Sequence, residues 1–207
     1  MGNMKKYHHG NLEEALLTAG LQEAKARGPR NLGVNFLAKE VKVSPTAVYR
    51  HFLSGESLRA SISQQAREEL ARQMLKAIAK QTDVENRFRA VGRAYINFAL
   101  NDPGLFAVAF VACEEGPKRE DSPSAWMVLQ DSILDISNAN LIEVSELEQV
   151  ANFAWATVHG FATLAGGSDP RRPKTNEKTI SDLLDRTWSG IIQLGSKNSV
   201  KDKLGAK

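Results

Sequence analysis

Residues 36–52 contain two short helical patterns joined by a tight turn, and this stretch limits the possible folds more than any other. In the first pattern, Phe36, Leu37 and Val41 recur at one-turn spacing, which predicts a helix with a single apolar face. Ser44 is a favourable N-cap, and Pro45 follows at the first helical position of the second pattern. The stretch therefore predicts two helices that pack against each other across a short turn.

The second of these helices has an outer face that folding does not require. Val48 and Phe52 lie four residues apart and are expected to face inward. The other positions carry small, hydroxyl, phenol, guanidinium or imidazole side chains and form the candidate reading surface: Thr46, Ala47, Tyr49, Arg50 and His51. Such a surface suits a helix-turn-helix that reads base edges and phosphates of double-stranded DNA.

Charge is distributed unevenly along the chain. Residues 1–60 carry nine Lys or Arg and five Asp or Glu, which gives a net charge of +4. Residues 61–207 carry 18 Lys or Arg and 19 Asp or Glu, so this part of the chain is nearly neutral. A basic N-terminal segment on a neutral body is consistent with a nucleic-acid partner for that segment alone. An accidental asymmetry of a solvated surface explains the same charges equally well, so the motif carries more of the inference.

Several classes of protein are disfavoured by composition. The single cysteine, Cys113, excludes an internal disulfide framework and a Cys-based zinc site, and the pair His8-His9 provides too few ligands for a metal. No apolar run approaches the ~20 residues of a membrane span. No glycine-rich phosphate loop or Gly-x-Ser-x-Gly motif is present. We therefore expect a cytoplasmic protein without enzymatic activity, metal or other cofactor, and without a membrane partner.

Helical periodicity continues through the rest of the chain, so we predict an all-α fold. Helices are expected over residues 11–27, 55–80, 83–101, 124–139, 145–165 and 176–194. The apolar segment 105–111 could be a strand by itself, but its helical neighbours favour a short helix. We expect a three-helix DNA-binding domain over 1–55, joined by a long fourth helix to a ligand-binding and dimerisation domain over 56–196, and a disordered tail over 197–207.

The residues around the two short helices resemble the DNA-binding signature of the tetracycline-repressor (TetR) family. The resemblance is carried by Leu37-Ala38, Val43-Ser44, Thr46-x-x-Tyr49-x-His51-Phe52 and the following Leu58. The opening residues 7–12 are similar to a common N-terminus in part of that family. The segment Trp155-Ala-Thr-Val-His159-Gly160 resembles a Trp-x-x-x-His-Gly motif of one class of TetR C-terminal domains.

The resemblance implies roles for individual residues of the second helix. Thr46, Ala47 and Arg50 would face the bases, whereas Tyr49, His51 and Ser44 would contact phosphate. Arg50 could form a bidentate contact with guanine. The family usually has a lysine at the start of the fourth helix, where this chain has Gly55. That departure puts one phosphate contact in doubt and predicts a weaker salt dependence of DNA binding.

The C-terminal part contains more large aromatic residues than a small helical core usually needs. As a group, its aromatic residues and one histidine are candidate effector-binding residues: Phe88, Tyr95, Phe98, Phe106, Phe110, Trp126, Trp155 and His159. A role for His159 as a buried, hydrogen-bonded core residue stays open, and each aromatic residue taken singly could also be core. The wide apolar faces of the last two helices supply the expected dimer interface: Val158, Phe161, Leu184, Trp188 and Ile191.

Together these features predict a homodimeric regulator of transcription, most often a repressor, that binds a palindromic operator and is released by a small apolar or amphipathic effector. Two alternatives stay open at this point. One is a DNA-binding dimer without an effector, which an aromatic cluster packed without a cavity would favour. The other is an adaptor whose N-terminal domain docks on another protein, which unchanged DNA binding after substitution of Tyr49 or Arg50 would favour.

Overall fold

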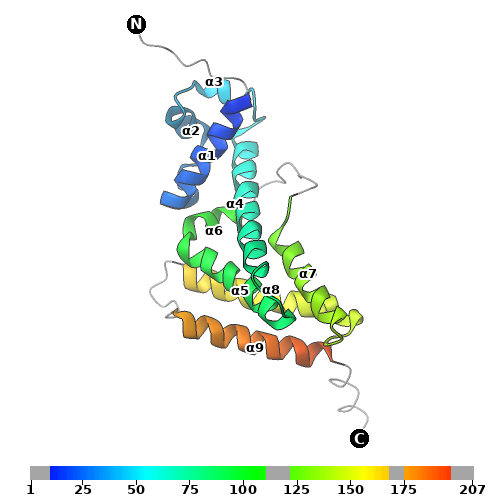
Figure 1. The fold of residues 1–207 in the computed structure, drawn as a ribbon. Helices are drawn as coiled ribbons and strands as arrows, with labels where there is room; N and C mark the ends of the chain where they lie inside the picture. Colours follow the sequence, from blue (N-terminus) through cyan, green and yellow to red (C-terminus); the bar gives the residue numbers. More distant parts are fainter. Residues whose placement is uncertain (1–9, 111–121, 168–174, 197–207) are drawn as a thin grey trace, which may run out of the picture. The chain divides into compact units, whose positions relative to one another are not determined.

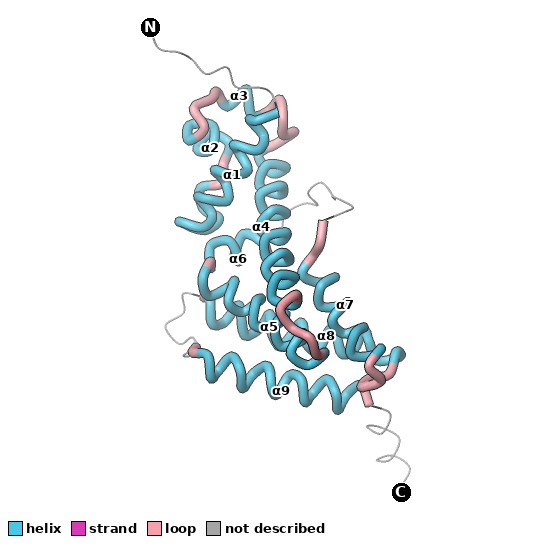
Figure 2. The backbone as a smooth tube through the Cα atoms, in the orientation of Figure 1, coloured by secondary structure: helices cyan, strands magenta, loops and turns pink. Residues whose placement is uncertain are grey.

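The computed structural model describes residues 10–110, 122–167 and 175–196, and these residues form helices joined by short turns. No strand occurs within these three ranges, as the tube in Figure 2 shows, so the prediction of an all-α fold is confirmed. The described helices belong to two compact units (Figure 1). Among the described residues, one unit contains 10–67 and 102–110, and the other contains 68–101, 122–167 and 175–196.

The first unit is the N-terminal one. Its elements are α1 (Gly10–Arg27), the 3-10 turn η1 (Gly28–Asn31), α2 (Val34–Glu40), α3 (Pro45–Val48), the first half of α4 (Gly55–Ile78) and α6 (Pro103–Ala109). Helix α1 has 18 residues, whereas α2, α3 and α6 have seven or fewer. Leu16, Leu37, Leu58 and Ile62 are fully buried in this unit. The expected short helix after residue 101 is therefore α6, and the strand alternative for this segment is wrong.

Serine side chains cap two helices of this unit. The Ser44 hydroxyl accepts a hydrogen bond from the backbone N–H of Ala47 at 3.3 Å, and Pro45 occupies the first position of α3, as the sequence predicted. At the start of α4, Ser54 and Ser57 each accept a bond from the other's backbone N–H at 3.0 Å. These reciprocal bonds satisfy two backbone donors and fix where α4 begins.

Helix α6 packs against α1 with close backbone contact. A Cβ atom added to Gly104 would lie 2.0 Å from the carbonyl oxygen of Ala24, so only glycine permits this approach. Beside it, Lys25 on α1 forms an ion pair of 2.7 Å with Asp102, the residue before α6. Helix α6 therefore belongs to the same compact unit as the N-terminal helices.

In the second unit, α5 (Val84–Asn101) is the central helix. It contacts three further helices, namely α7 (Ala125–Asn138), α8 (Leu147–Gly166) and α9 (Glu177–Gly195), and the turn η2 (Val144–Glu146) precedes α8. Gly92 permits the close packing of α5 and α9, because a Cβ atom there would lie 2.5 Å from a methyl carbon of Leu184. An ion pair of 3.0 Å between Arg87 and Asp135 joins α5 to α7.

Three helices of this unit begin at the polar residues that the sequence indicated. Asp83 accepts a bond from the backbone N–H of Asn86 at 2.8 Å at the start of α5, and this bond lowers the pKa of the Asp83 carboxyl. Ser124 caps α7 at 3.1 Å and Asn176 caps α9 at 2.9 Å. Such bonds satisfy backbone donors that a helix leaves unpaired in its first turn.

The helix α4 contributes to both compact units, since the division between them falls after Arg67. The sequence predicted the functional boundary at residue 55, where α4 begins, and this boundary stays a prediction. None of the described helices is long and apolar enough to cross a membrane.

Candidate DNA-binding surface and effector cavity

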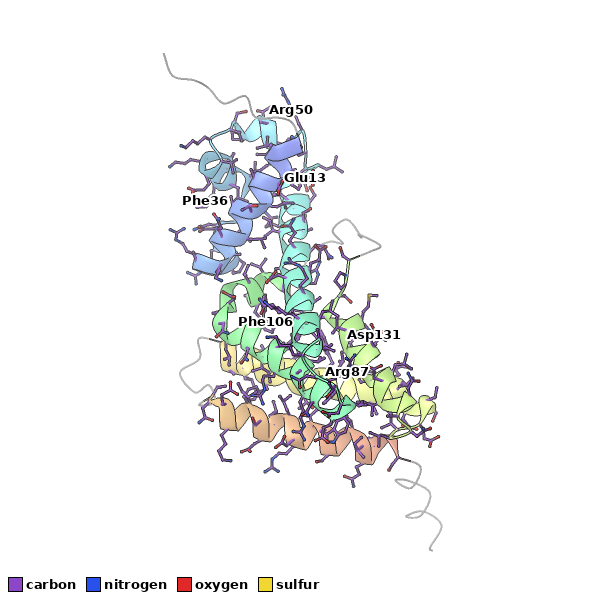
Figure 3. All side chains as sticks on the ribbon, in the orientation of Figure 1. Glu13, Phe36, Arg50, Arg87, Phe106 and Asp131 are labelled. Carbon is purple, nitrogen blue, oxygen red and sulfur yellow. The ribbon has the colours of Figure 1, made fainter. Side chains whose placement is uncertain are left out.

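The second helix of the helix-turn-helix presents its polar residues to solvent. Thr46, Tyr49 and Arg50 are exposed, with 54% of Tyr49 accessible, and Figure 3 shows Arg50 extending away from the helices of its unit. Ala47 and His51 are half-buried beside them, and Ser44 is exposed at the N-cap. All six predicted DNA-contacting residues therefore lie on one short segment.

Two buried residues, Val48 and Phe52, anchor this segment in the core of its unit. Val48 has no exposed surface and Phe52 is 5% exposed, as their spacing predicted. The segment continues after α3 as a turn, because the backbone N–H groups of His51 and Phe52 both donate to the carbonyl oxygen of Val48 at 3.0 Å. The polar side chains are thus displayed from a backbone that packing and hydrogen bonds fix.

The turn between α2 and α3 is closed by backbone bonds that end α2. Val43 donates to the carbonyl of Ala38 at 2.9 Å and Lys42 donates to that of Lys39 at 3.1 Å. Lys42 has a φ of 59°, so it adopts the left-handed conformation that glycine usually provides at this point. This Schellman arrangement sets the angle at which α3 leaves α2.

Exposed cations flank the segment. Lys39, Arg50 and Arg59 are exposed, and within the described part of the chain none has an acidic partner within 4 Å. Gly55 occupies the first position of α4, where the family usually has lysine. Positive charge without internal compensation is what a phosphate backbone attracts.

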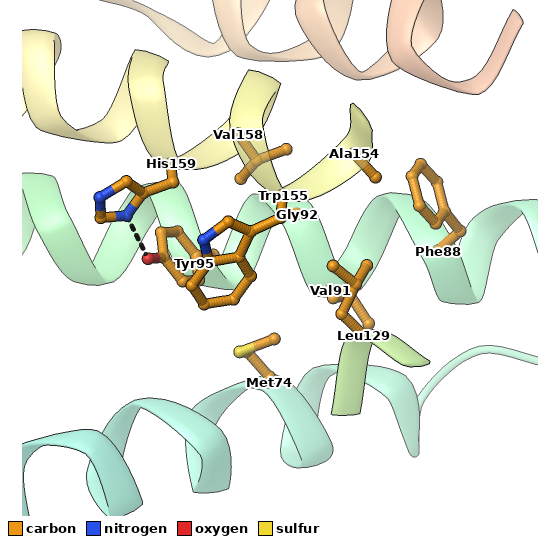
Figure 4. Close-up of a pocket in the computed structure, with 10 residues that line it drawn as sticks. All are labelled: Met74, Phe88, Val91, Gly92, Tyr95, Leu129, Ala154, Trp155, Val158 and His159. Carbon is orange, nitrogen blue, oxygen red and sulfur yellow. Dashed lines mark hydrogen bonds between the residues drawn. The ribbon is translucent and has the colours of Figure 1, made fainter. Parts of the chain in front are cut away.

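The second unit contains a small cavity between α4, α5, α7 and α8 (Figure 4). Ten residues line it: Met74, Phe88, Val91, Gly92, Tyr95, Leu129, Ala154, Trp155, Val158 and His159. The centre of a water-sized sphere can occupy a volume of about 20 Å³ in this cavity, which is room for about one water molecule. The lining is almost entirely apolar.

The polar groups of this cavity are paired with each other. The Tyr95 hydroxyl lies 2.7 Å from Nδ1 of His159 (Figure 4). Burial raises the pKa of the Tyr95 phenol and lowers the pKa of the His159 imidazole. Both groups are therefore neutral near pH 7, and a phenol that donates to Nδ1 selects the imidazole tautomer with its proton on Nε2.

Trp155 forms one wall of the cavity between other aromatic rings. Its ring stacks on His159 at 5.8 Å with an angle of 8° between the planes, and it meets Tyr95 edge-on at 5.3 Å. The ring of Trp126 also meets it edge-on, at 5.6 Å and 82°. A molecule larger than water can occupy the cavity only if this cluster rearranges.

Only some of the predicted effector residues meet at this cavity. Phe88, Tyr95, Trp155 and His159 line it, and Trp126 supports it from outside. Phe98 is buried elsewhere in α5, and Phe106 and Phe110 pack on each other at 5.0 Å in the first unit. Met74 and Leu129 also line the cavity, and their spacing in the sequence is that of ordinary core residues.

The residues predicted for the dimer interface differ in accessibility. Val158, Leu184 and Ile191 are buried within the single chain, and Val158 also lines the cavity. Phe161 and Trp188 are half-buried, and the Trp188 ring lies 5.8 Å from that of Phe88. The exposed apolar positions on α8 and α9 are Phe153, Leu164 and Leu194. Among the described residues, no group of three or more His, Cys, Asp or Glu could hold a metal ion.

Two family models match this chain. Residues 16–62 match the model described as "Bacterial regulatory proteins, tetR family", and residues 88–187 match the one described as "Tetracyclin repressor-like, C-terminal domain". The first covers the helix-turn-helix and the second covers the helices around the cavity. The chain belongs to the TetR family. It is therefore a DNA-binding regulator of transcription and not an enzyme.

Solved structures share the TetR fold along nearly the whole chain. A protein of unknown function from Rhodococcus sp. RHA1 is 25% identical, with a TM-score of 0.75 over 93% of this chain and 100% of that one. A TetR family regulator from Marinobacter aquaeolei VT8 is 17% identical, with a TM-score of 0.65 over 87% and 95%. RolR in complex with resorcinol is 12% identical, with a TM-score of 0.61 over 95% and 93%. No curated protein matches the sequence. The Trp-x-x-x-His-Gly subtype stays a prediction.

Proposed function

We propose that this TetR regulator acts in the cytoplasm as a homodimer that binds a palindromic operator and represses the adjoining genes. The observation that carries the proposal is the exposed surface of Thr46, Tyr49 and Arg50 on a helix that Ser44 caps and Val48 anchors. Guanidinium and hydroxyl groups fixed in this way suit contacts with bases and phosphates in a major groove. Two-fold symmetry would place two such surfaces about 34 Å apart, or a little more.

The homodimer would form through the exposed faces of α8 and α9. Phe153, Gly160 and Leu164 lie at intervals of seven and four residues, which places them on one side of α8. A Cβ atom added at position 160 would meet no described atom of the surrounding chain within 4 Å, so this glycine leaves open space beside α8. Gly190 on α9 leaves room for the Phe153 ring, which would lie 3.0 Å from an added Cβ. These exposed positions replace the buried Val158, Leu184 and Ile191 in the proposed interface.

We further propose that a small, mostly apolar effector enlarges and occupies the cavity beside Trp155 and releases the operator. The apolar walls and the Tyr95–His159 pair support such a ligand, since they combine contact area with one hydrogen-bonding position. The effector must bind the DNA-incompetent conformation more tightly, and each ~1.4 kcal/mol of difference shifts the equilibrium tenfold. RolR, which has the same fold, was solved with the small phenol resorcinol.

A second candidate function is a DNA-binding dimer without an effector. The free space of about 20 Å³ favours it, because the aromatic cluster leaves little room for any ligand. Both functions share the same DNA-binding surface and differ only in whether the cavity opens.

Two experiments test these functions in turn. Selection of genomic fragments by the purified protein gives the operator, and gel-shift titration then measures its affinity; an absence of preferred fragments contradicts the DNA proposal.

For the effector, Ala154→Val partly fills the cavity, whereas Ala156→Val adds the same groups on the exposed side of α8. We expect small phenols such as resorcinol to release the operator from the wild type and the Ala156 variant, but not from Ala154→Val. If no small apolar compound changes DNA binding, the effector-free function is supported.

A further inference from the structure

A second concave site lies in the same unit as the cavity but has the opposite character. It is a groove of about 640 Å³ between the second half of α4 and the middle of α5. None of the residues that line it lines the apolar cavity, although both sites use these two helices. Alanine residues 77, 90 and 94 leave the groove open, and cationic and amide side chains surround it.

Positive charge dominates the side chains of this groove. Arg72 and Lys76 lie four residues apart on one side of α4, and Lys80 follows four residues later, just after the helix ends at Ile78. Arg93 on α5 adds a fourth cation. Like charges four residues apart repel each other on a helix, and an exposed helix face more commonly alternates charges of opposite sign.

Two of the four cations are already neutralised by the chain itself. Glu69, the acidic residue in the groove, forms an ion pair of 2.5 Å with Arg72. Its carboxylate also accepts a hydrogen bond of 2.9 Å from the side-chain amide of Gln73. Arg93 pairs with Glu177 of α9 and donates to the Ser181 hydroxyl at 2.9 Å. These contacts hold Arg72 and Arg93 in position at the groove.

The other two cations remain uncompensated. Lys76 and Lys80 are exposed, and among the residues that the structure describes neither has an acidic partner within 4 Å. A lysine near the end of α4 is favoured by the helix dipole, which accounts for Lys76 in the last turn. The dipole accounts neither for the groove nor for Lys80, which lies beyond the end of α4 at Ile78.

We propose that this groove binds a small polyanion, a molecule with two or more negative charges on phosphate or carboxylate groups. Lys76 and Lys80 supply the attraction, while the amides of Gln73, Gln81 and Asn97 supply hydrogen-bond donors beside them. The volume of the groove lies within the range of ordinary small-molecule sites. This ligand site is additional to the apolar effector cavity and does not depend on it.

Titration calorimetry of the full chain tests the groove with sodium tripolyphosphate and with citrate, at low and at physiological salt. The test variant, Lys76→Gln with Lys80→Gln, keeps helix-forming side chains and removes both charges. We expect it to bind the anion about tenfold more weakly, since two attractive charges are lost. The matched control, Lys39→Gln with Arg59→Gln, removes two exposed cations of the DNA-binding unit that have no acidic partner among the described residues, and it should leave the affinity unchanged.

Equal weakening in both double variants, or weakening in the control alone, would overturn the proposal, because the anion would then bind the DNA-reading surface. Absence of binding to the wild type at millimolar probe and low salt would overturn it as well. Binding of tripolyphosphate without citrate identifies phosphate as the recognised group, and binding of both identifies charge alone. Hydrogen exchange of the wild type gives a readout without substitution: protection by tripolyphosphate is expected in residues 69–81 and 90–97, and protection confined to 39–59 contradicts the site.

Discussion

The two compact units place their candidate functional side chains in opposite environments. In the first unit, Thr46, Tyr49 and Arg50 are exposed on a short helix whose buried residues only hold it in place. In the second unit, Tyr95 is buried and Trp155 is half-buried, and both line the cavity and pack against its other side chains. Function and folding therefore use different residues in the DNA-binding unit and the same residues in the other.

This difference determines how each unit can respond to substitution. An exposed Arg50 can be replaced with little effect on stability, because it makes no contact that folding requires. A change at Tyr95 or Trp155 alters packing and ligand binding together, so the two effects must be separated by a matched variant.

Gly160→Leu tests whether the second unit also has an outward-facing functional surface. A Cβ atom at this position would meet no described atom of the surrounding chain within 4 Å, and the leucine side chain would separate α8 from a partner helix. Because the substitution occurs twice in a symmetric dimer, we expect a loss of about 2–6 kcal/mol of dimer stability. Sedimentation should show monomers at micromolar concentration with unchanged helix content. Gln130→Leu, at an exposed position of α7, should remain dimeric; a dimeric Gly160→Leu would remove α8 from the interface.

Arg50→Ala tests the outward surface of the DNA-binding unit. We expect a loss of about 1–3 kcal/mol in specific operator binding, on the order of tenfold to hundredfold in affinity. Arg50→Lys keeps the charge but not the bidentate geometry, so it should retain non-specific binding and lose specificity. Fluorescence anisotropy with operator and random DNA measures both. Arg186→Ala on α9 removes an equal charge and should bind normally; unchanged specificity in Arg50→Ala would favour a protein-docking role for this surface.

Gly55→Lys restores the cation that the family usually has at the start of α4. A Cβ atom here would lie 3.3 Å from a methyl of Val34, so the methyl must shift by a few tenths of an ångström. The added phosphate contact should steepen the dependence of log affinity on log salt by about 0.9. Glu56→Gln raises the net charge equally without a cation at this position and serves as the control. Equal slopes for the wild type and Gly55→Lys would mean that DNA does not contact this end of α4.

The smallest effect is expected from the interior pair of the second unit. Burial holds the pKa of His159 below its unfolded value, so the unfolded chain binds the proton more readily than the folded chain. Stability from this group is therefore complete above the unfolded pKa and decreases as pH falls from there towards the folded pKa. Urea unfolding at pH 7.5 and 5.5 should show a smaller decrease for His159→Gln than for the wild type. An identical pH dependence would mean that His159 titrates as it does in water.

The same contrast explains which features the sequence could predict. The helix starts at Ser44, Asp83, Ser124 and Asn176 were predicted correctly, because capping depends on a few neighbouring residues. The outer face of α3 was also visible, since Arg50 and Tyr49 have no role in a core. Where they lie in space is now known, and their contacts with DNA stay a prediction.

Residues of the second unit were harder to assign from the sequence. Phe106 and Phe98 have the same side chain as the cavity residue Phe88, and only tertiary packing separates them. Met74 lines the cavity, whereas Leu70 and Ile78, buried four residues before and after it on α4, do not. Helix periodicity likewise could not distinguish Val158, which faces its own core, from an interface residue.

The stacked position of Trp155 has a kinetic consequence. A ligand that enters only after this ring leaves His159 and Trp126 binds no faster than the ring moves. The observed rate of binding would then rise with ligand concentration at first and level off at the rate of that motion. At high effector concentration, the rate of operator release would accordingly be limited by the motion of this ring and would not rise further as more effector accumulates.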